Sequence, residues 1–209
     1  ITVGGGLRTL DDINKVLRAG ADKISINTAA IQNPGFITEA SHAFGSSTIV
    51  IAIETIKQSD NSYLAYTDNG REHTGVDAIS WAKEAEERGA GEILLTSIDQ
   101  EGTGNGFDLD LIKRVSDSVT IPVIAHGGAA NDSHIYASIN KSGADAVAIA
   151  SMLHYAALNR NDNLVNDYNT EGNTEFLEKK GSFKMFGKEN IREIKDKLNK
   201  DDIPLRILN

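Results

Sequence analysis

The sequence has no cysteine, which excludes disulfide bonds and thiolate metal ligands. It also has no long apolar run and no signal peptide, and these absences together favour a cytoplasmic protein. Basic residues are in the minority, because 21 lysines and arginines stand against 30 acidic residues and give a net charge of −9. Nucleic-acid binding needs a basic face, so we expect no nucleic-acid partner, and we expect no membrane association.

The remaining composition is that of an ordinary globular domain. Apolar residues make up 40% and charged residues 24% of the 209 residues, which is typical of one folded domain. The 19 glycines gather in short runs rather than forming a linker. An anionic substrate stays compatible with the acidic composition, because backbone amides at helix N-termini can hold phosphate without lysine or arginine.

Short β-branched segments alternate along the chain with segments of helical periodicity. This alternation predicts an α/β fold with parallel strands joined by crossover helices. Two segments interrupt it: an expected β-hairpin insertion at residues 56–75, with Asn69-Gly70 as a two-residue turn, and a polar insertion at about residues 159–181. The expected strands cover residues 1–3, 23–27, 48–53, 92–98, 122–125 and 146–150.

An internal repeat is the most informative feature of the sequence. Gly4-Gly5 recurs as Gly127-Gly128, and Gly20-Ala21-Asp22 recurs as Gly143-Ala144-Asp145, both at an offset of 123 residues. A period of this length holds four βα units, so two periods predict a (βα)8 TIM barrel of duplicated half-barrels.

The expected strands number fewer than the eight that such a barrel needs. We therefore expect residues 1–209 to form a single incomplete (βα)8 barrel domain that lacks strands 1 and 2, roughly 75–80 residues if the whole has the usual length of about 250. The apolar, strand-like start at Ile1 fits a cut through a domain. The alternative is a self-sufficient open α/β sheet, although an open parallel edge is a liability.

The repeat places two candidate anion sites at the carboxyl ends of the strands, where barrel active sites lie. Each joins a tight glycine turn to N–H groups that open a helix, an arrangement that binds phosphate. Glycines that only make tight turns are the alternative. Two such sites predict a bisphosphorylated small-molecule substrate. The first site comprises Gly5, Gly6, Asn27 and Thr28, and the second Gly127, Gly128, Ala150 and Ser151.

Acidic residues follow two neighbouring strands between these sites. Glu54 ends an apolar strand and is expected to point into the barrel mouth, where burial raises the pKa of a carboxyl and lets it exchange protons near neutrality. We predict that Glu54 is catalytic and that Thr96, Asp99 and Thr103 bind substrate. The histidines lack metal-ligand spacing, so we expect no metal and no cofactor.

Several motifs resemble the cyclase subunit of imidazole glycerol phosphate synthase, and the resemblance covers the chain from Ile1 to about Tyr155 and again near Ile191. It implies that ammonia from a glutaminase partner reacts with a bisphosphorylated aminoimidazole carboxamide ribulosyl nucleotide. The implied products are imidazole glycerol phosphate, for histidine biosynthesis, and an aminoimidazole carboxamide ribotide. The motifs are Val3-Gly4-Gly5-Gly6, Ser25-Ile26-Asn27-Thr28-Ala29-Ala30, Gly127-Gly128-Ala129 and the run from Gly89 to Asp99.

The sequence departs from this family at three points. The family's catalytic pair is an aspartate on the first strand and another on the fifth; the first strand is absent, and Glu54 stands at the second position with one more methylene. His126 replaces a residue that is usually small, and the polar insertion is extra. These departures leave open a paralogue that delivers ammonia to a surface sugar, or an inactive phosphate-binding fragment.

Lys23 and Glu92 begin their strands, at the end opposite the glycine turns. They resemble the salt-bridged gate through which the family admits ammonia at the barrel floor. The alternative is a pair of charges that only packs that floor.

Overall fold

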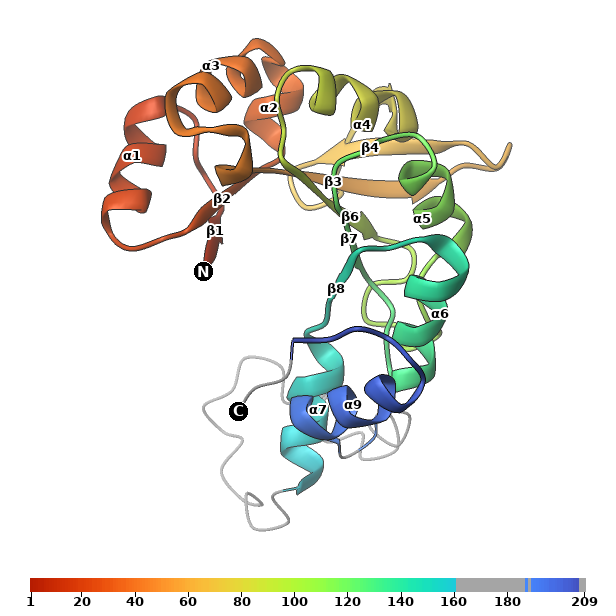
Figure 1. Ribbon diagram of the computed structural model, residues 1–209. Coiled ribbons are helices and arrows are strands. Elements are labelled where there is room, and N and C mark those ends of the chain that lie inside the picture. Colours follow the sequence, from red (N-terminus) through yellow and green to blue (C-terminus); the bar gives the residue numbers. More distant parts are fainter. Residues whose placement is uncertain (161–186, 188, 207–209) are drawn as a thin grey trace, which may run out of the picture.

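The computed structural model describes residues 1–160, 187 and 189–206, in which strands and helices alternate (Figure 1). The strands are β1 (Thr2–Gly4), β2 (Lys23–Ile26), β3 (Ile49–Lys57), β4 (Tyr63–Thr67), β5 (Glu72–Asp77), β6 (Glu92–Ser97), β7 (Val123–His126) and β8 (Ala146–Ala148). The helices are α1 (Leu10–Arg18), α2 (Thr28–Gln32), α3 (Gly35–Phe44), α4 (Ala78–Glu87), α5 (Leu109–Ser116), α6 (Asp132–Ser142), α7 (Ser151–Arg160) and α9 (Ile191–Lys200), and a 3₁₀ turn covers Ser46–Thr48.

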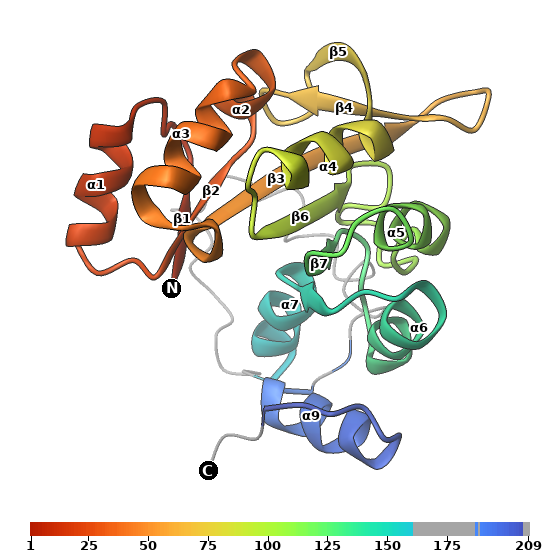
Figure 2. The same ribbon diagram turned by 45° about the horizontal axis from the view of Figure 1, so that its top comes forward.

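Six of these strands form one parallel row in the order β1-β2-β3-β6-β7-β8. The sheet is strongly curved, and helices α1, α3, α4, α5 and α6 cover its convex side (Figures 1 and 2). Within the described residues β1 and β8 form the two edges and do not pair with each other. The predicted α/β fold of TIM-barrel type is therefore confirmed, with the barrel wall open between β1 and β8.

Side chains on the strands alternate between the two faces of this sheet. The residues that face the helices are almost fully buried and form the core with apolar residues of the helices. Burial of each such side chain contributes roughly 1.5–3 kcal/mol. On β2, β3 and β6 they are Ile24, Ile26, Ile49, Ile51, Ile53, Ile93 and Leu95. The intervening positions face the concave side, which leaves this side for polar chemistry.

The repeat seen in the sequence is also a repeat in structure. At the offset of 123 residues, β2 corresponds to β8 and α1 to α6. The N–H of Asp145 donates to the carbonyl of Val123 at 3.0 Å, and its carboxylate accepts from the Val123 N–H at 2.9 Å. In the other half, the N–H of Asp22 donates to the carbonyl of Ile1 at 2.8 Å. In both halves a backbone hydrogen bond therefore joins the segments that lead into two adjacent parallel strands.

The third strand differs from its expected form. β3 runs on to Lys57, so the expected end at residue 53 is wrong and Glu54 lies inside the strand. The cause is tertiary, because residues 54–57 pair antiparallel with β4. The turn from β4 to β5 is also longer than the expected two residues: Asp68, Asn69 and Gly70 all have left-handed backbone conformations, with φ of 55°, 58° and 76°.

Tyr63 attaches this hairpin to the rest of the fold. Its ring is fully buried, and its hydroxyl donates to Asp108 at 3.0 Å, while Asp108 also caps α5 by accepting from the Leu111 N–H. Burial, reinforced by Asp108, raises the pKa of Tyr63 well above its ordinary value. The ammonium of Lys57 lies 5.4 Å from the ring centroid. These contacts hold the hairpin against the sheet and so position its tip.

Two short helices, α2 and α3, follow β2. They are separate because Asn33 precedes Pro34, and the residue before a proline avoids helical geometry. The expected polar insertion at about residues 159–181 lies almost entirely outside the described residues.

Candidate functional site

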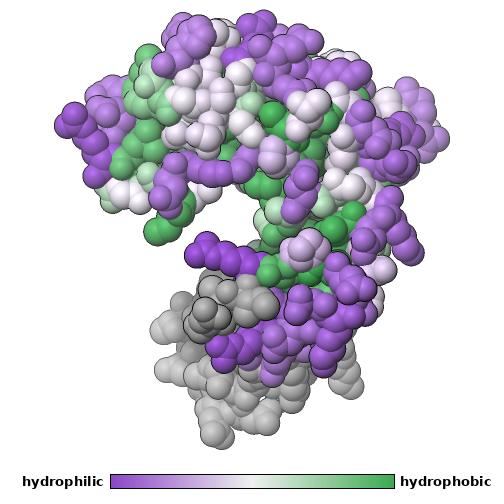
Figure 3. All heavy atoms as spheres, in the orientation of Figure 1, coloured by the Kyte–Doolittle hydropathy of each residue, from purple (hydrophilic) through white to green (hydrophobic). Residues whose placement is uncertain are grey.

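The larger cavity opens on the concave side at the carboxyl ends of β1, β2 and β3. Its volume is about 400 Å³, and the space-filling view shows the molecule hollowed on this side (Figure 3). All four residues predicted for the first anion site line it, and so does Glu54. Asp68 and Asn69, from the tip of the hairpin, complete its wall. The hairpin is thus part of the site.

Gly5 and Gly6 line this cavity in backbone conformations that favour glycine, with φ of 100° and 70°. A Cβ at either position would meet no atom within 4 Å, so the requirement for glycine here comes from the backbone torsion and not from lack of space. Consecutive residues in such a turn can expose N–H groups toward an anion. The cavity beside them is large enough for a phosphate group.

Asn27 and Thr28 join β2 to α2 at the edge of the same cavity. Asn27 does not cap the helix with its side chain; its amide donates instead to the carbonyl oxygen of Tyr66 on the hairpin at 3.1 Å. The Asn27 amide was predicted to bind substrate, but one of its hydrogen bonds holds the hairpin instead. The hydroxyl of Thr28 stands at the first residue of α2.

Glu54 is half-buried in this cavity, and the hairpin holds its carboxylate. The Gly70 N–H donates to Glu54 Oε2 at 2.9 Å. Burial raises the pKa of Glu54 above its ordinary value; the hydrogen bonds from Gly70 and Asn27 oppose this rise, and the charge of Glu101 adds to it. A carboxyl with a raised pKa that faces an open cavity is suited to general acid–base catalysis.

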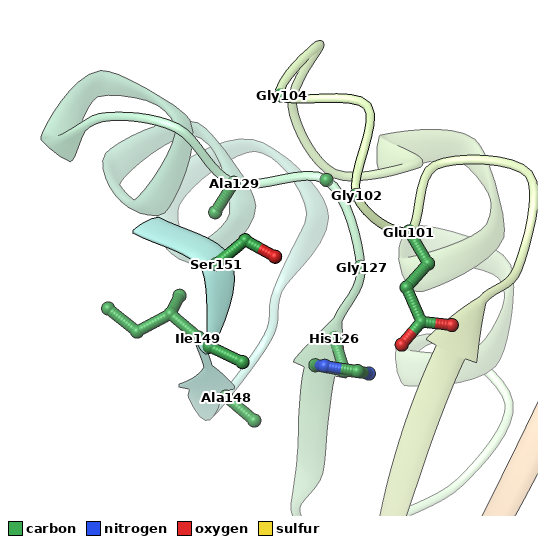
Figure 4. A pocket seen from close by; sticks show the side chains of 11 residues that line it. Glu101, Gly102, Gly104, His126, Gly127, Ala129, Ala148, Ile149 and Ser151 are labelled. Carbon is green, nitrogen blue, oxygen red and sulfur yellow. The ribbon is translucent and has the colours of Figure 1, made fainter. Parts of the chain in front are cut away.

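The second cavity lies at the carboxyl ends of β7 and β8 and is smaller, about 40 Å³. The residues predicted for the second anion site, Gly127, Gly128, Ala150 and Ser151, all line it (Figure 4). Unlike the first pair, these glycines are also required by packing. A Cβ on Gly127 would lie 2.6 Å from the Ser97 carbonyl oxygen, and one on Gly128 would lie 2.2 Å from that of Gly106.

Two side chains in this second cavity were not among the predicted site residues. His126 and Glu101 both line it, and Figure 4 shows the His126 ring with Glu101 on one side and the segment that ends at Ser151 on the other. The sequence held a signal for His126, since a histidine there is unusual for the family that the motifs resemble. Nothing distinguished Glu101 from other loop acids.

Three of the predicted substrate-binding residues do not line either cavity. Thr96 does not line the second cavity itself, but its Oγ1 lies 3.1 Å from Nδ1 of His126, which does. The Asp99 carboxylate accepts from the Lys57 N–H at 2.8 Å, which ties β6 to the extended end of β3. The Thr103 hydroxyl donates to the Gln100 carbonyl at 2.8 Å within its own loop.

Lys23 and Glu92 lie at the amino ends of β2 and β6, and neither residue lines the first or the second cavity. Their side chains form a salt bridge across the intervening β3, with 34% and 20% of the side-chain surface exposed. The exposed bridge between Lys15 and Asp11 on α1 has 71% and 68% exposed. The partly buried pair is screened less by water, so its geometry is better defined.

The described residues contain neither a metal-type cluster nor a membrane-spanning helix. In residues 1–160, 187 and 189–206, no three His, Asp or Glu side chains come together as a metal site would require. No helix in that part of the chain is long and apolar enough to cross a membrane.

The curled parallel sheet, with both cavities at the carboxyl ends of its strands, defines a barrel-type α/β protein with a candidate site at the barrel mouth. The sequence model of the family described as "Histidine biosynthesis protein" matches residues 1–159, and the chain belongs to this family.

Individual relatives are similar over most of the chain. Imidazole glycerol phosphate synthase subunit HisF of Lachnoclostridium phytofermentans is 52% identical over 162 residues, which are 77% of this chain and 63% of the relative. The proteins of that name from Pyrobaculum aerophilum and Trichormus variabilis are 53% and 50% identical, over 76% of this chain in both cases. The chain spans about 63% of the length of these relatives.

Proposed function

We propose that this chain belongs to the cyclase subunit of an imidazole glycerol phosphate synthase. The observation that carries the proposal is the position of Glu54, a half-buried acid whose pKa is raised: it lines the first of two glycine-lined cavities at one end of a parallel barrel wall. Membership of the histidine biosynthesis family and the names of the similar proteins support it.

The proposed substrate is a bisphosphorylated aminoimidazole carboxamide ribulosyl nucleotide, which reacts with ammonia to give imidazole glycerol phosphate and aminoimidazole carboxamide ribotide. One phosphate would bind at Gly5, Gly6 and Thr28, and the other at Gly127, Gly128 and Ser151. Glu54 lies in register with Thr96, Thr96 with His126 and His126 with Ala148, so one row of inward-facing residues leads from the first cavity to the second. A substrate with a phosphate at each end would lie along this row and bring its middle past Glu54.

Glu54 would act as a general acid–base. Its raised pKa keeps both protonation states accessible closer to neutral pH than for an ordinary glutamate, and one well-placed acid–base group contributes about 10²–10⁴ in rate. The barrel wall would be completed by two further parallel strands between β8 and β1, and we propose that the second acid of the reaction is supplied there.

Ammonia would enter from the opposite end. We propose that a glutaminase partner binds the face formed by the amino ends of the strands and that the salt bridge between Lys23 and Glu92 guards the passage. Oppositely charged side chains that meet across a strand can separate and close again, so they suit a gate for a small neutral molecule.

A second candidate function is amidation of an activated sugar by a paralogous ammonia-using barrel. The observation that favours it is that Glu54, which is longer than the aspartate of the family that the motifs resemble, has its own hydrogen bond from Gly70.

The first test of both candidates is turnover with ammonium salt in the full-length protein. For the cyclase, Glu54→Gln lowers turnover of the bisphosphorylated nucleotide about 10²–10⁴-fold while substrate binding persists.

Glu72→Gln is the matched control, because Glu72 is an exposed acid on the same hairpin. Its turnover is expected to equal that of the unaltered protein. Full activity of Glu54→Gln would contradict the acid–base role, and no turnover of the nucleotide by the unaltered protein would contradict the cyclase function.

A further inference from the structure

His126 is the last residue of β7 and projects into the second cavity beside Gly127 and Gly128 (Figure 4). Its Nδ1 lies 3.1 Å from Oγ1 of Thr96, the residue in register with it on β6. Thr96 is only 8% exposed, so this contact is shielded from water. The contact fixes which way the ring is turned.

The orientation of the ring determines where its second nitrogen lies. The two nitrogens of an imidazole point to opposite sides of the ring, and Nδ1 is turned toward β6. Nε2 therefore points away from Thr96, and the His126 side chain lines the cavity. A histidine can donate from Nε2 while Nδ1 keeps its partner, either as the neutral tautomer or as the imidazolium.

The charges around the second cavity indicate that a bound anion needs a donor of this kind. Glu101 contributes a carboxylate to the cavity wall, and no lysine or arginine is among the described residues that line it. A bound dianion would be repelled by Glu101, and among the described residues of the lining only the His126 side chain can become a cation. Thr96 on β6, Ala148 on β8 and Ser151 on α7 carry no charge.

We propose that His126 is a ligand of the anionic group in the second cavity, donating from Nε2, and that Thr96 orients it. This inference rests on the proposed function, because it assumes that the cavity binds one phosphate of the substrate. It adds a specificity-determining side chain: a dianionic phosphate binds more tightly when His126 is an imidazolium, since charge-assisted hydrogen bonds are roughly twice as strong as neutral ones. Anion affinity in this cavity should therefore be higher at acidic than at alkaline pH, since histidine is the residue type whose charge changes near neutrality, whereas no histidine is among the described residues that line the first cavity.

The test uses sulfate as the probe, because sulfate keeps one charge state between pH 6 and pH 8. Binding to the full-length protein is followed by NMR through the backbone amides of Gly127, Gly128 and Ser151, and the amides of Gly5 and Gly6 serve as an internal control. We expect sulfate to bind the second cavity about tenfold more tightly at pH 6 than at pH 8, the scale of one charge-assisted hydrogen bond. The first cavity should not show this change.

Two substitutions separate the contributions of the two ring nitrogens. His126→Gln places an uncharged donor near the position of Nε2, and His126→Asn keeps a group near Nδ1 but cannot reach the ligand. Both are expected to abolish the pH dependence, with His126→Asn about tenfold weaker at pH 6 and His126→Gln intermediate. If sulfate affinity and its pH dependence in His126→Asn equalled those of the unaltered protein, the inference would be overturned.

The neighbours of His126 supply two further controls. Glu101→Gln should strengthen sulfate binding at both pH values and keep the dependence on pH; loss of that dependence would assign it to Glu101 and overturn the role of His126. Thr96→Val should weaken binding at pH 6, and Thr96→Ser, which keeps the hydroxyl, should restore it. Equal binding by these two variants would overturn the orienting role of Thr96.

Failure of this inference and failure of the proposed function give different results. If the unaltered protein binds sulfate in the second cavity but the His126 variants bind it equally well, only the inference fails. If sulfate does not perturb Gly127, Gly128 and Ser151 at either pH, the two-phosphate site of the proposed function fails with it.

Discussion

The backbone N–H of Gly70 donates a hydrogen bond to Oε2 of Glu54 over 2.9 Å, so a β-hairpin tip holds the acid at the barrel mouth. The hairpin is itself fastened, through Asn27 to the carbonyl of Tyr66 and through Tyr63 to Asp108. Strand β3 therefore fixes the backbone of Glu54, and the hairpin tip fixes its carboxylate. Such support is what catalysis by a precisely placed group requires.

Shortening the acid tests whether the site is built for its length. Glu54→Asp withdraws the carboxylate by about an ångström from Gly70, and a displacement of that size costs about 10² in rate. We expect turnover with ammonium salt to fall by roughly that factor while phosphate binding is unchanged. Preserved or increased turnover would instead indicate that the site keeps the geometry of an aspartate, as in the family that the motifs resemble.

The raised pKa of Glu54 has a consequence for stability. Because its pKa in the folded protein lies above the ordinary value of 4.5, the folded state binds the proton more tightly than the unfolded state. The stability from this group is present below the ordinary value and is lost as pH rises through the folded pKa. In urea unfolding, the free energy of unfolding of Glu54→Gln minus that of the unaltered protein should therefore be larger at pH 7 than at pH 4. If this difference were the same at both pH values, ionisation of Glu54 would not be its cause. Glu72→Gln is the control.

Gly70 is expected to be irreplaceable for activity. Its φ is 76°, and a Cβ would lie 2.6 Å from Cδ1 of Ile98, so Gly70→Ala must distort the turn that holds Glu54. Gly45→Ala is the matched control, because Gly45 has a φ of 86° but open space around it. Both variants should lose about 1–3 kcal/mol of unfolding free energy, because both positions have a positive φ that favours glycine. Only Gly70→Ala should also lower turnover, and equal turnover in the two variants would show that the hairpin tip does not position Glu54.

The salt bridge between Lys23 and Glu92 is expected to matter for glutamine but not for free ammonia. Lys23→Ala and Glu92→Ala should lower glutamine-dependent turnover in the complex and leave ammonium-dependent turnover within about twofold, because the bridge lies at the opposite strand ends from both cavities. Lys15→Ala, which breaks an exposed bridge on α1, is the control. If glutamine-dependent turnover were unchanged in both variants, Lys23 and Glu92 would have only a packing role at the barrel floor.

Much of this fold could be predicted from local pattern. Alternation of β-branched and helical segments specifies strands and crossover helices, since side-chain periodicity follows directly from backbone geometry. The offset of 123 residues predicted which glycines, strands and hydroxyls correspond, and β2 with β8 and α1 with α6 obey it. The residues of both anion sites came from this repeat, and each set lines one cavity.

The sequence by itself thus determined most element types, their order and the two sets of glycine-turn residues that line the cavities, because these depend on neighbours in the chain and on the 123-residue repeat. Tertiary structure alone decided the contacts that tune the site. Gly70 lies 16 residues from Glu54, Thr96 lies 30 from His126, and Lys23 lies 69 from Glu92. Such pairs form only when strand register, sheet curvature and a folded-back hairpin bring distant segments together. For the same reason the length of β3, the burial of Glu54 and the position of His126 could not be read from their own neighbours in the chain.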